Sequence, residues 1–261
     1  MVETVLIPEH DRATLCVSCQ VGCSLRCSFC HTGTQKFAAN LSVAEILQQY
    51  FALPEGIREM VTNFVFMGQG EPLYNFGNVA GAVQTITHTK GMAFGHGRVT
   101  ISTSGIVPLI PKIATQLGVN LAVSLHAPND ELRTRIMSIN KMFPIRTLMA
   151  ACKEFVDEAS CATRRVSFEY VMLQGVNDHP DHANELARLV RRLPAHINLI
   201  PFNAWPGAAY QCSSPADIEA FQQVLEGWGI AVTVRKTRGQ DIMAACGQLK
   251  SSLESKTVLS V

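Results

Sequence analysis

The sequence predicts an α/β fold, an open or partial β/α barrel of about six parallel strands. Short runs rich in Val, Ile, Leu and Phe alternate with helical stretches along all 261 residues. Continuous apolar runs of this kind are typical of strands that are buried on both faces. Strands that alternate with helices pair in parallel through right-handed crossovers. Six or seven such units favour a barrel whose chemistry lies at the carboxyl ends of its strands.

The expected elements follow one another in a regular order. Strands are predicted at 14–21, 61–67, 98–103, 120–125, 165–173, 196–201 and 230–235. Helices are predicted at 42–51, 78–89, 107–116, 145–159, 180–193 and 215–228. Ser42 and Glu45 have the spacing of a capping box for the first helix, and Gly118 stands where a helix should stop. No repeat or domain-sized linker interrupts the pattern, so one domain over residues 1–261 is expected.

Composition excludes several classes of protein. Hydrophobic residues make up 47% of the chain, which is neither disordered nor fibrous. No apolar run reaches the length of a membrane span, and the first ten residues do not resemble a signal peptide. Nine cysteines are present, and five of them crowd between Cys16 and Cys30, unlike a secreted disulfide framework. We therefore expect a cytoplasmic protein with no membrane partner. The net charge of +1 gives no sign of a nucleic-acid binder, so any RNA contact must use local basic patches.

Three cysteines in one tight loop predict an iron–sulfur centre. Cys23, Cys27 and Cys30 can direct three thiolates at a [4Fe–4S] cluster, which normally takes four, so one iron stays open for a small molecule. A zinc site remains an alternative, with Cys16 and Cys19 as one ligand pair and Cys27 and Cys30 as the other. The short separation of these pairs, with Cys23 left over, makes zinc the weaker interpretation. Unligated, reduced cysteines are the third.

Polar motifs fall at the ends of the predicted strands. Residues 68–72 follow the second strand, and their glycines allow backbone to approach a ligand closely, while Glu71 can accept from an ammonium or hydroxyl group. A plain turn with a solvated Glu71 is the alternative. Ser102 ends the third strand, and Ser124 with His126 ends the fourth. Asn203 follows the sixth strand. His126 alone would be read as a core histidine, but its neighbours favour a ligand-binding rim.

The cysteine loop is similar to the signature of the radical S-adenosylmethionine (SAM) enzymes, and further motifs resemble one family within them. These motifs are VETV at 2–5, IP at 7–8, CVSCQVGC at 16–23, FMGQGEPL at 66–73, STSG at 102–105, LAVSLHA at 121–127, VRKTRG at 234–239 and AACGQL at 244–249. Together they resemble the RlmN/Cfr family of radical SAM RNA methyltransferases over nearly the whole chain.

The resemblance implies cofactors and roles for individual residues. The cofactors would be a [4Fe–4S] cluster on Cys23, Cys27 and Cys30, and SAM. The implied SAM contacts are Gly70, Glu71, Ser102, Ser124, Leu125, His126 and Asn203. Cys246 would carry the methyl group, Cys16 would resolve the covalent protein–RNA adduct through a disulfide with Cys246, and Glu3 would accept the proton. Cys19 departs from the serine that the family commonly has, and it is assigned no role.

The resemblance also implies a substrate and partners. The RlmN branch of the family methylates carbon 2 of adenine in 23S rRNA and in some tRNAs. An electron donor such as flavodoxin and a monomeric state are expected. Alternatives are methylation at carbon 8, as in the Cfr branch, another radical SAM reaction, or a zinc-binding RNA module that is not an enzyme. Family members carry an N-terminal domain of about one hundred residues, and these 261 residues do not include it. The resemblance therefore leaves two alternatives, a fragment of a longer protein or a reduced form of the family.

Overall fold

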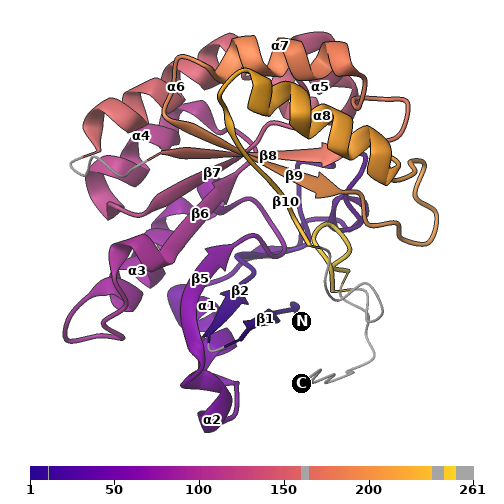
Figure 1. The fold of residues 1–261 in the computed structure, drawn as a ribbon. Helices are drawn as coiled ribbons and strands as arrows, with labels where there is room; N and C mark the ends of the chain where they lie inside the picture. The colour runs from indigo at the N-terminus through magenta and orange to yellow at the C-terminus, as the bar shows by residue number, and fades with distance from the viewer. Residues whose placement is uncertain (11, 160–164, 237–243, 251–261) are drawn as a thin grey trace.

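A computed structural model describes residues 1–10, 12–159, 165–236 and 244–250 of the chain. Its main feature is an eight-stranded sheet in the order β1-β2-β5-β6-β7-β8-β9-β10 (Figure 1). The strands are β1 (Val5–Glu9), β2 (Arg12–Cys16), β5 (Val61–Phe66), β6 (Val99–Thr103), β7 (Asn120–Ser124), β8 (Val166–Met172), β9 (Ala195–Pro201) and β10 (Ala231–Val234). Only β1 is antiparallel to its neighbour in this sheet. The sheet curves into an open half-barrel, which confirms the predicted fold class, with one parallel strand more than the predicted six.

Helices cover the outer face of this sheet (Figure 1). The α-helices are α1 (Val43–Phe51), α2 (Glu55–Arg58), α3 (Phe76–Thr87), α4 (Ile110–Lys112), α5 (Asp130–Ile136), α6 (Ile145–Glu158), α7 (Pro180–Val190) and α8 (Pro215–Gly227). Short 3-10 turns are η1 (Thr32–Thr34), η2 (Pro72–Asn75), η3 (His96–Arg98), η4 (Val107–Leu109) and η6 (Ser138–Lys141). The predicted capping box is present, because the Ser42 hydroxyl accepts from the Glu45 amide while the Glu45 carboxylate accepts from the Ser42 amide.

The structure differs from the sequence prediction in three respects. The strand predicted at 14–21 ends at Cys16, and the following residues form a separate two-stranded ladder of β3 (Gln20–Val21) with β4 (Ala39–Asn40). The helix predicted at 107–116 is broken into η4, α4 and a π-helical turn, η5 (Ile113–Leu117). Pro108 and Pro111 cause this break, since neither has an N–H for a regular helix ladder. The third difference is that β1, α2 and α5 were not predicted.

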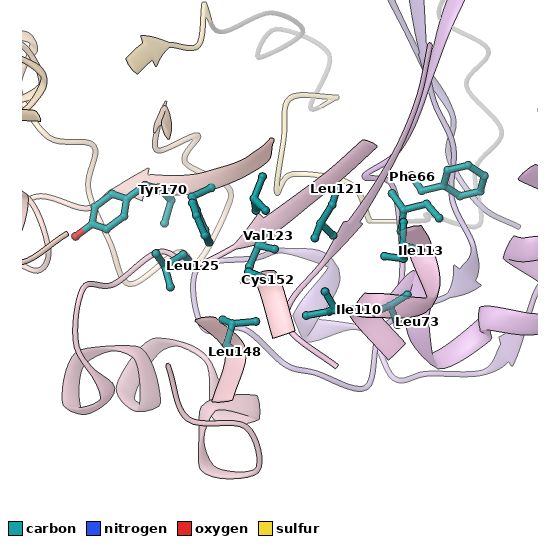
Figure 2. Close-up of a cluster of buried hydrophobic side chains, with 14 of the residues drawn as sticks. Phe66, Leu73, Ile110, Ile113, Leu121, Val123, Leu125, Leu148, Cys152 and Tyr170 are labelled. Atoms are coloured by element: carbon teal, nitrogen blue, oxygen red, sulfur yellow. The ribbon is translucent and has the colours of Figure 1, made fainter. Parts of the chain in front are cut away.

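The core lies between the sheet and its covering helices. Figure 2 shows side chains of β7, such as Leu121 and Val123, meeting Ile110 and Ile113 from the α4–η5 segment. Leu148 and Cys152 of α6 join this cluster, and both are fully buried. A layer packed in this way fixes the height of each strand, so that the strand ends above it stand at defined positions.

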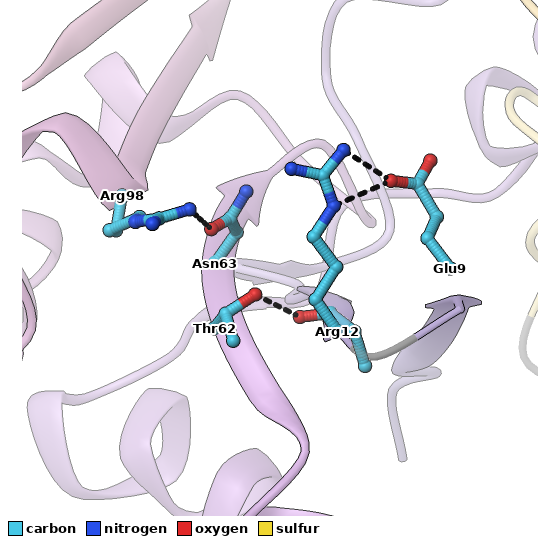
Figure 3. Close-up of polar contacts among 6 residues, drawn as sticks. Glu9, Arg12, Thr62, Asn63 and Arg98 are labelled. Atoms are coloured by element: carbon cyan, nitrogen blue, oxygen red, sulfur yellow. Dashed lines mark hydrogen bonds and ion pairs between the residues drawn. The ribbon is translucent and has the colours of Figure 1, made fainter.

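The amino ends of the strands carry ordinary surface contacts (Figure 3). Arg12 forms an exposed ion pair with Glu9 at 2.8 Å, and Arg98 donates to the Asn63 side chain at 3.3 Å. Exposed pairs of this kind add little to stability. Among the described residues, no helix has both the length and the apolar character needed to cross a membrane. The polar motifs of interest gather at the opposite, carboxyl end of the sheet.

Candidate active site

One cavity at the carboxyl end of the sheet collects most of the predicted site residues. Its lining includes the three loop cysteines and residues from six parallel strands or the turns after them. The predicted site residues in this lining are Cys23, Cys27, Cys30, Gly70, Glu71, Ser102, Ser124, His126, Asn203 and Cys246. Glu3, Cys16 and Leu125 do not belong to the lining. Parallel strands end at one rim, and this explains why residues far apart in sequence meet here.

The cysteine loop is fastened to the end of α5. The Ser28 amide donates to the Ile136 carbonyl at 3.0 Å, and the Ser138 hydroxyl donates to the Leu25 carbonyl at 3.1 Å. These bonds bracket Cys27 from both sides and hold its part of the loop against the rim. Arg26 has a positive φ of 51°, which makes the sharp turn between two of the cysteines.

The surroundings of the three loop thiols favour the protonated form unless a cation binds their sulfur atoms. Burial raises the pKa of Cys23 to about 11, and it also raises the pKa values of Cys27 and Cys30 above the usual range. The charge of another loop thiol raises the pKa values of Cys23 and Cys27 further, and Cys246 does the same for Cys30. Three thiolates therefore cannot coexist here without positive charge beside them. A [4Fe–4S] cluster supplies it, and the donor set fits such a cluster.

A mononuclear zinc site fits this geometry less well. In the part of the chain that the structure describes, no three His, Cys, Asp or Glu side chains are close enough together to hold one metal ion. Zinc needs its ligands around a single centre, about 2.3 Å from each sulfur. A cluster instead binds each thiolate to a different iron, and its ligands stand further apart.

Glu71 is buried at the centre of the glycine loop. Its carboxylate accepts from the Thr103 hydroxyl and the Ser104 amide, both at 2.7 Å, and from the Leu73 amide at 3.0 Å. Burial raises the pKa of Glu71, while these hydrogen bonds oppose the rise. Gly70 has a φ of 101°, and a Cβ there would lie 2.5 Å from the Gln20 Cβ. The loop is thus packed so tightly that only glycine fits at position 70.

His126 presents a neutral imidazole to the cavity. Its Nδ1 accepts from the Val171 amide at 3.0 Å, so the ring proton is on Nε2. Burial and the nearby Arg133 charge lower the pKa of His126 to about 3. Phe29 of the cysteine loop packs edge-on against the ring, with centroids 4.7 Å apart. Leu125, its neighbour, is fully buried and points into the core (Figure 2).

A short C-terminal segment, residues 244–250, holds Cys246 over the cavity. The His31 amide donates to the Gly247 carbonyl at 2.8 Å, and the Thr32 hydroxyl donates to the Leu249 carbonyl at 2.5 Å. On the other side, Asn203 Nδ2 donates to the Cys246 carbonyl at 3.1 Å. The segment therefore bridges the cysteine loop and the end of β9. The Cys246 side chain itself is exposed.

Cys16 lies at the end of β2, buried beneath this arrangement. Burial and the nearby Cys246 raise the pKa of Cys16 to about 12, while Arg235 opposes the rise. The two thiols predicted to pair are therefore within electrostatic range of each other. Glu3 lies nearby, where it accepts from Gln69 Nε2 at 3.4 Å. Burial raises the pKa of Glu3, and the Lys250 amide opposes this rise with a hydrogen bond. Cys19 is buried, and its thiol donates to the Gln69 carbonyl at 3.6 Å.

Three charged residues of the site were not assigned to it from the sequence. Glu169 and Arg235 both line the cavity, and Arg133 is buried behind it. Glu169 accepts from Asn198 Nδ2 at 2.7 Å and from the Ser167 hydroxyl at 2.8 Å. A lone carboxylate inside an apolar strand is a usable signal for Glu169, because burying a charge is costly.

The basic run 235–238 lies just before Cys246 in the sequence and could hold RNA phosphates near the chemistry, and Arg235 lines the cavity. Thr237 and Arg238 lie outside the described residues. Of the cysteines outside the sequence motifs, Cys152 is buried, as is usual for a free cysteine, whereas Cys212 is exposed. Cys161 also lies outside the described residues.

Comparison with known proteins gives this geometry a family context. The model of the radical SAM superfamily matches residues 17–188. The dual-specificity RNA methyltransferase RlmN of Methylocella silvestris is 49% identical over 97% of this chain and 67% of its own length. The RlmN of Parvibaculum lavamentivorans is 50% identical over 96% of this chain and 65% of its own length. The chain thus spans about two thirds of the length of these relatives.

A solved structure agrees with these sequence relatives. The crystal structure of a radical SAM methyltransferase from Sphaerobacter thermophilus superposes with a TM-score of 0.91 and 48% identity. The match covers 95% of this chain and 73% of that one. The likeness therefore includes the sheet, the cysteine loop and most of the rim described above.

Proposed function

Because this chain belongs to the radical SAM superfamily and, within it, to the RlmN family of RNA methyltransferases, we propose that it methylates carbon 2 of an adenosine in 23S rRNA and in some tRNAs. The observation that carries this proposal is the position of Cys246. The segment 244–250 holds this exposed cysteine over the cavity that the three loop cysteines also line. A radical SAM enzyme without a methyl-carrying cysteine would have no use for this arrangement.

The cofactors of the family, a [4Fe–4S] cluster and SAM, have matching groups in the cavity. Cys23, Cys27 and Cys30 would hold the cluster. When bound, the cluster supplies the electron that cleaves SAM and begins radical chemistry. Of the remaining lining residues, those that would bind SAM are Gly70, Glu71, Ser102, Ser124, His126 and Asn203.

The polar groups of the rim suit the parts of SAM. The Glu71 carboxylate and the backbone at Gly70 suit the ammonium group. Ser102 and Ser124 offer hydroxyl groups for a carboxylate or ribose. His126 offers a fixed N–H donor at Nε2, since its Nδ1 is already engaged by the Val171 amide.

Cys246, Glu3 and Cys16 would each carry out one of the later steps of the reaction. Cys246 receives a methyl group on sulfur and carries it to the adenine ring, which is too electron-poor to attack SAM directly. Glu3 accepts the proton that leaves carbon 2, and its raised pKa suits a base that must take up a proton. The Cys16 sulfur then attacks the Cys246 sulfur: a disulfide forms, the bond from the Cys246 sulfur to the carbon attached to adenine breaks, and that carbon takes up a proton as the methylated RNA leaves. The electrostatic coupling between these two thiols supports this pairing.

The test is the modification that the chain leaves in RNA. The protein is expressed in bacterial cells that lack their own enzyme, and nucleosides from 23S rRNA and tRNA are separated and weighed. We expect 2-methyladenosine with the unchanged chain and none with Cys246→Ala. 8-Methyladenosine instead would assign the chain to carbon 8 chemistry. An unmethylated RNA pool from cluster-loaded protein would contradict the proposal.

The electron donor and the oligomeric state stay predictions. A flavodoxin is expected to reduce the cluster, and the protein is expected to be a monomer. Anaerobic reduction by purified flavodoxin and light scattering check these two points separately.

A further inference from the structure

Arg133 is a fully buried arginine directly behind the site. It belongs to α5, and all of its hydrogen bonds to the residues that the structure describes reach neutral acceptors. Nε donates to the Leu125 carbonyl at 3.1 Å, and Nη1 donates to the Asn140 side chain at 3.0 Å. Nη2 donates to the Ser104 carbonyl at 2.7 Å and to the Ser124 carbonyl at 3.1 Å. The guanidinium therefore ties together the ends of β6 and β7.

The charge of this arginine is not neutralised by an ion pair. Among the described residues, no carboxylate lies within ion-pair distance of Arg133. Asp130 is the nearby carboxylate: Asn140 bridges it to Arg133, since the Asn140 Nδ2 donates to Asp130 Oδ1 at 2.9 Å. Burying a charge without a partner is costly, so a buried cation with only neutral acceptors calls for a reason beyond strand-end bonding.

The anionic group close to Arg133 is the set of thiolates of the cysteine loop. The loop bonds to Ile136 and Ser138 place Cys27 against the same helix, one turn beyond Arg133. The Ser104 peptide completes the link, because its carbonyl accepts from Arg133 while its amide donates to Glu71.

We propose that Arg133 is a positioning residue whose buried charge tunes the reduction potential of the cluster held by Cys23, Cys27 and Cys30. A [4Fe–4S]²⁺ cluster with three thiolates carries one net negative charge, and one-electron reduction makes it two. A fixed cation behind Cys27 stabilises the more negative state, so it makes reduction easier. The low dielectric of the interior and the absence of screening ions make this effect larger than at a surface. This inference rests on the cluster of the proposed function.

The test is a redox titration of the reconstituted protein, followed by electron paramagnetic resonance of the reduced cluster. Arg133→Gln removes the charge, and Arg133→Lys keeps it while losing the forked hydrogen bonds. In the Arg133→Gln variant, we expect the equilibrium constant for one-electron reduction of the cluster to fall at least tenfold. This corresponds to a midpoint potential that is lower by about 59 mV or more. The Lys variant should stay within about threefold of the unchanged protein. Arg135→Gln, an exposed position on the same helix, should cause no shift.

A purely structural role for Arg133 predicts a different pattern. Both Gln and Lys variants would then lose thermal stability, while neither would change its midpoint potential. That result, in variants with full iron content, overturns the inference. If Arg133→Gln does not fold, Asp130→Asn decides, since removing this nearby negative charge should ease reduction by about twofold to threefold. No shift there overturns the inference as well. Unchanged protein that takes up no iron would overturn the proposed function itself.

Discussion

The side-chain amide of Asn203 donates to the backbone carbonyl of Cys246 at 3.1 Å. The sequence had suggested only a SAM contact for Asn203. It lines the cavity, and it also fixes the segment that carries the predicted methyl acceptor. One residue therefore connects the cofactor pocket with the position of Cys246.

Replacing Asn203 with Asp should loosen this segment. The substitution keeps the size of the side chain but puts an acceptor oxygen opposite the Cys246 carbonyl, and the loss of a hydrogen bond costs about 1 kcal/mol or more. We expect faster amide hydrogen exchange at His31, whose amide donates to the Gly247 carbonyl. Mass spectrometry of the peptide around His31 measures this rate. Asn184→Asp is the control, because the Asn184 amide donates to the Pro180 carbonyl within α7 and not to the C-terminal segment, and equal rates in both variants would contradict the linkage.

The loop cysteines should each be necessary for the cluster. Anaerobically prepared protein is expected to be brown, with about four irons per chain. Changing Cys23, Cys27 or Cys30 to Ala should abolish SAM cleavage, because a site with two thiolates cannot hold the cluster in place. Iron analysis and detection of 5′-deoxyadenosine check this. Cys19→Ser, at a buried cysteine outside the loop, should keep both. Bound zinc without iron would rule out the assignment.

The Cys246→Ala and Cys16→Ala variants should lose activity at different steps of the reaction. Active protein is expected to carry a methyl group on Cys246, and Cys246→Ala should lose RNA methylation while it keeps the cluster. Cys16→Ala should trap a covalent RNA–protein adduct, since the resolving thiol is gone. Denaturing gel electrophoresis with and without nuclease detects this adduct. Normal turnover by Cys16→Ala would show that the roles are wrongly assigned.

Gly70→Ala should disturb the glycine loop. Its φ of 101° is unfavourable for alanine, and the new Cβ would collide with Gln20, which accepts from the Glu71 amide. We expect a loss of about 2 kcal/mol or more in the free energy of unfolding, together with weaker SAM binding. Denaturant titration and calorimetry measure these. Gly77→Ala in α3, where a Cβ meets open space, should leave SAM binding unchanged and should not lower the free energy of unfolding, because alanine favours a helix over glycine by about 0.5–1 kcal/mol.

His126 should make stability depend on pH below neutrality. The pKa of His126 is about 3 in the folded protein, and that of an unfolded histidine is about 6.5. The unfolded chain therefore binds the extra proton first, and this contribution is present above pH 6.5 and lost as pH falls toward 3. The unchanged protein should lose about 2 kcal/mol more than His126→Asn between pH 7 and pH 5. Asn tolerates the positive φ at this position and can accept from Val171. Denaturant titrations at each pH measure the free energy of unfolding of both proteins. Curves against pH that run parallel for the unchanged protein and His126→Asn would contradict the prediction.

The strand ends and the residues on them were predictable from the sequence because they depend on local pattern. Runs such as 120–125 are apolar enough to be buried strands, and parallel strands must end at a common rim. Ser102, Ser124 and His126 then fall together by topology. The strand β1 was missed because Pro8 and Glu9 interrupt its apolar pattern, and such residues are tolerated only at a sheet edge.

The contacts behind the rim were not predictable, because they depend on partners distant in sequence. Arg133 lies in a short, charged helix of seven residues, and its sequence neighbours suggest a solvent-exposed arginine. Its burial follows from Ser104 and Ser124, which offer free carbonyls only after β6 and β7 have paired. The double contact of Asn203 likewise requires the C-terminal segment to fold back over the cavity.

The difference in exposure between Cys246 and Cys16 matters for handling the protein on the bench. Cys246 is open to solvent, while Cys16 is buried and its pKa of about 12 keeps it protonated near neutral pH. A thiol is attacked by electrophiles as its thiolate, so alkylating reagents and dissolved oxidants should reach Cys246 long before Cys16. A preparation kept in air would then lose its methyl acceptor while its overall fold stayed intact. Melting curves would report such a sample as sound, so the thiol itself should be titrated before activity is judged.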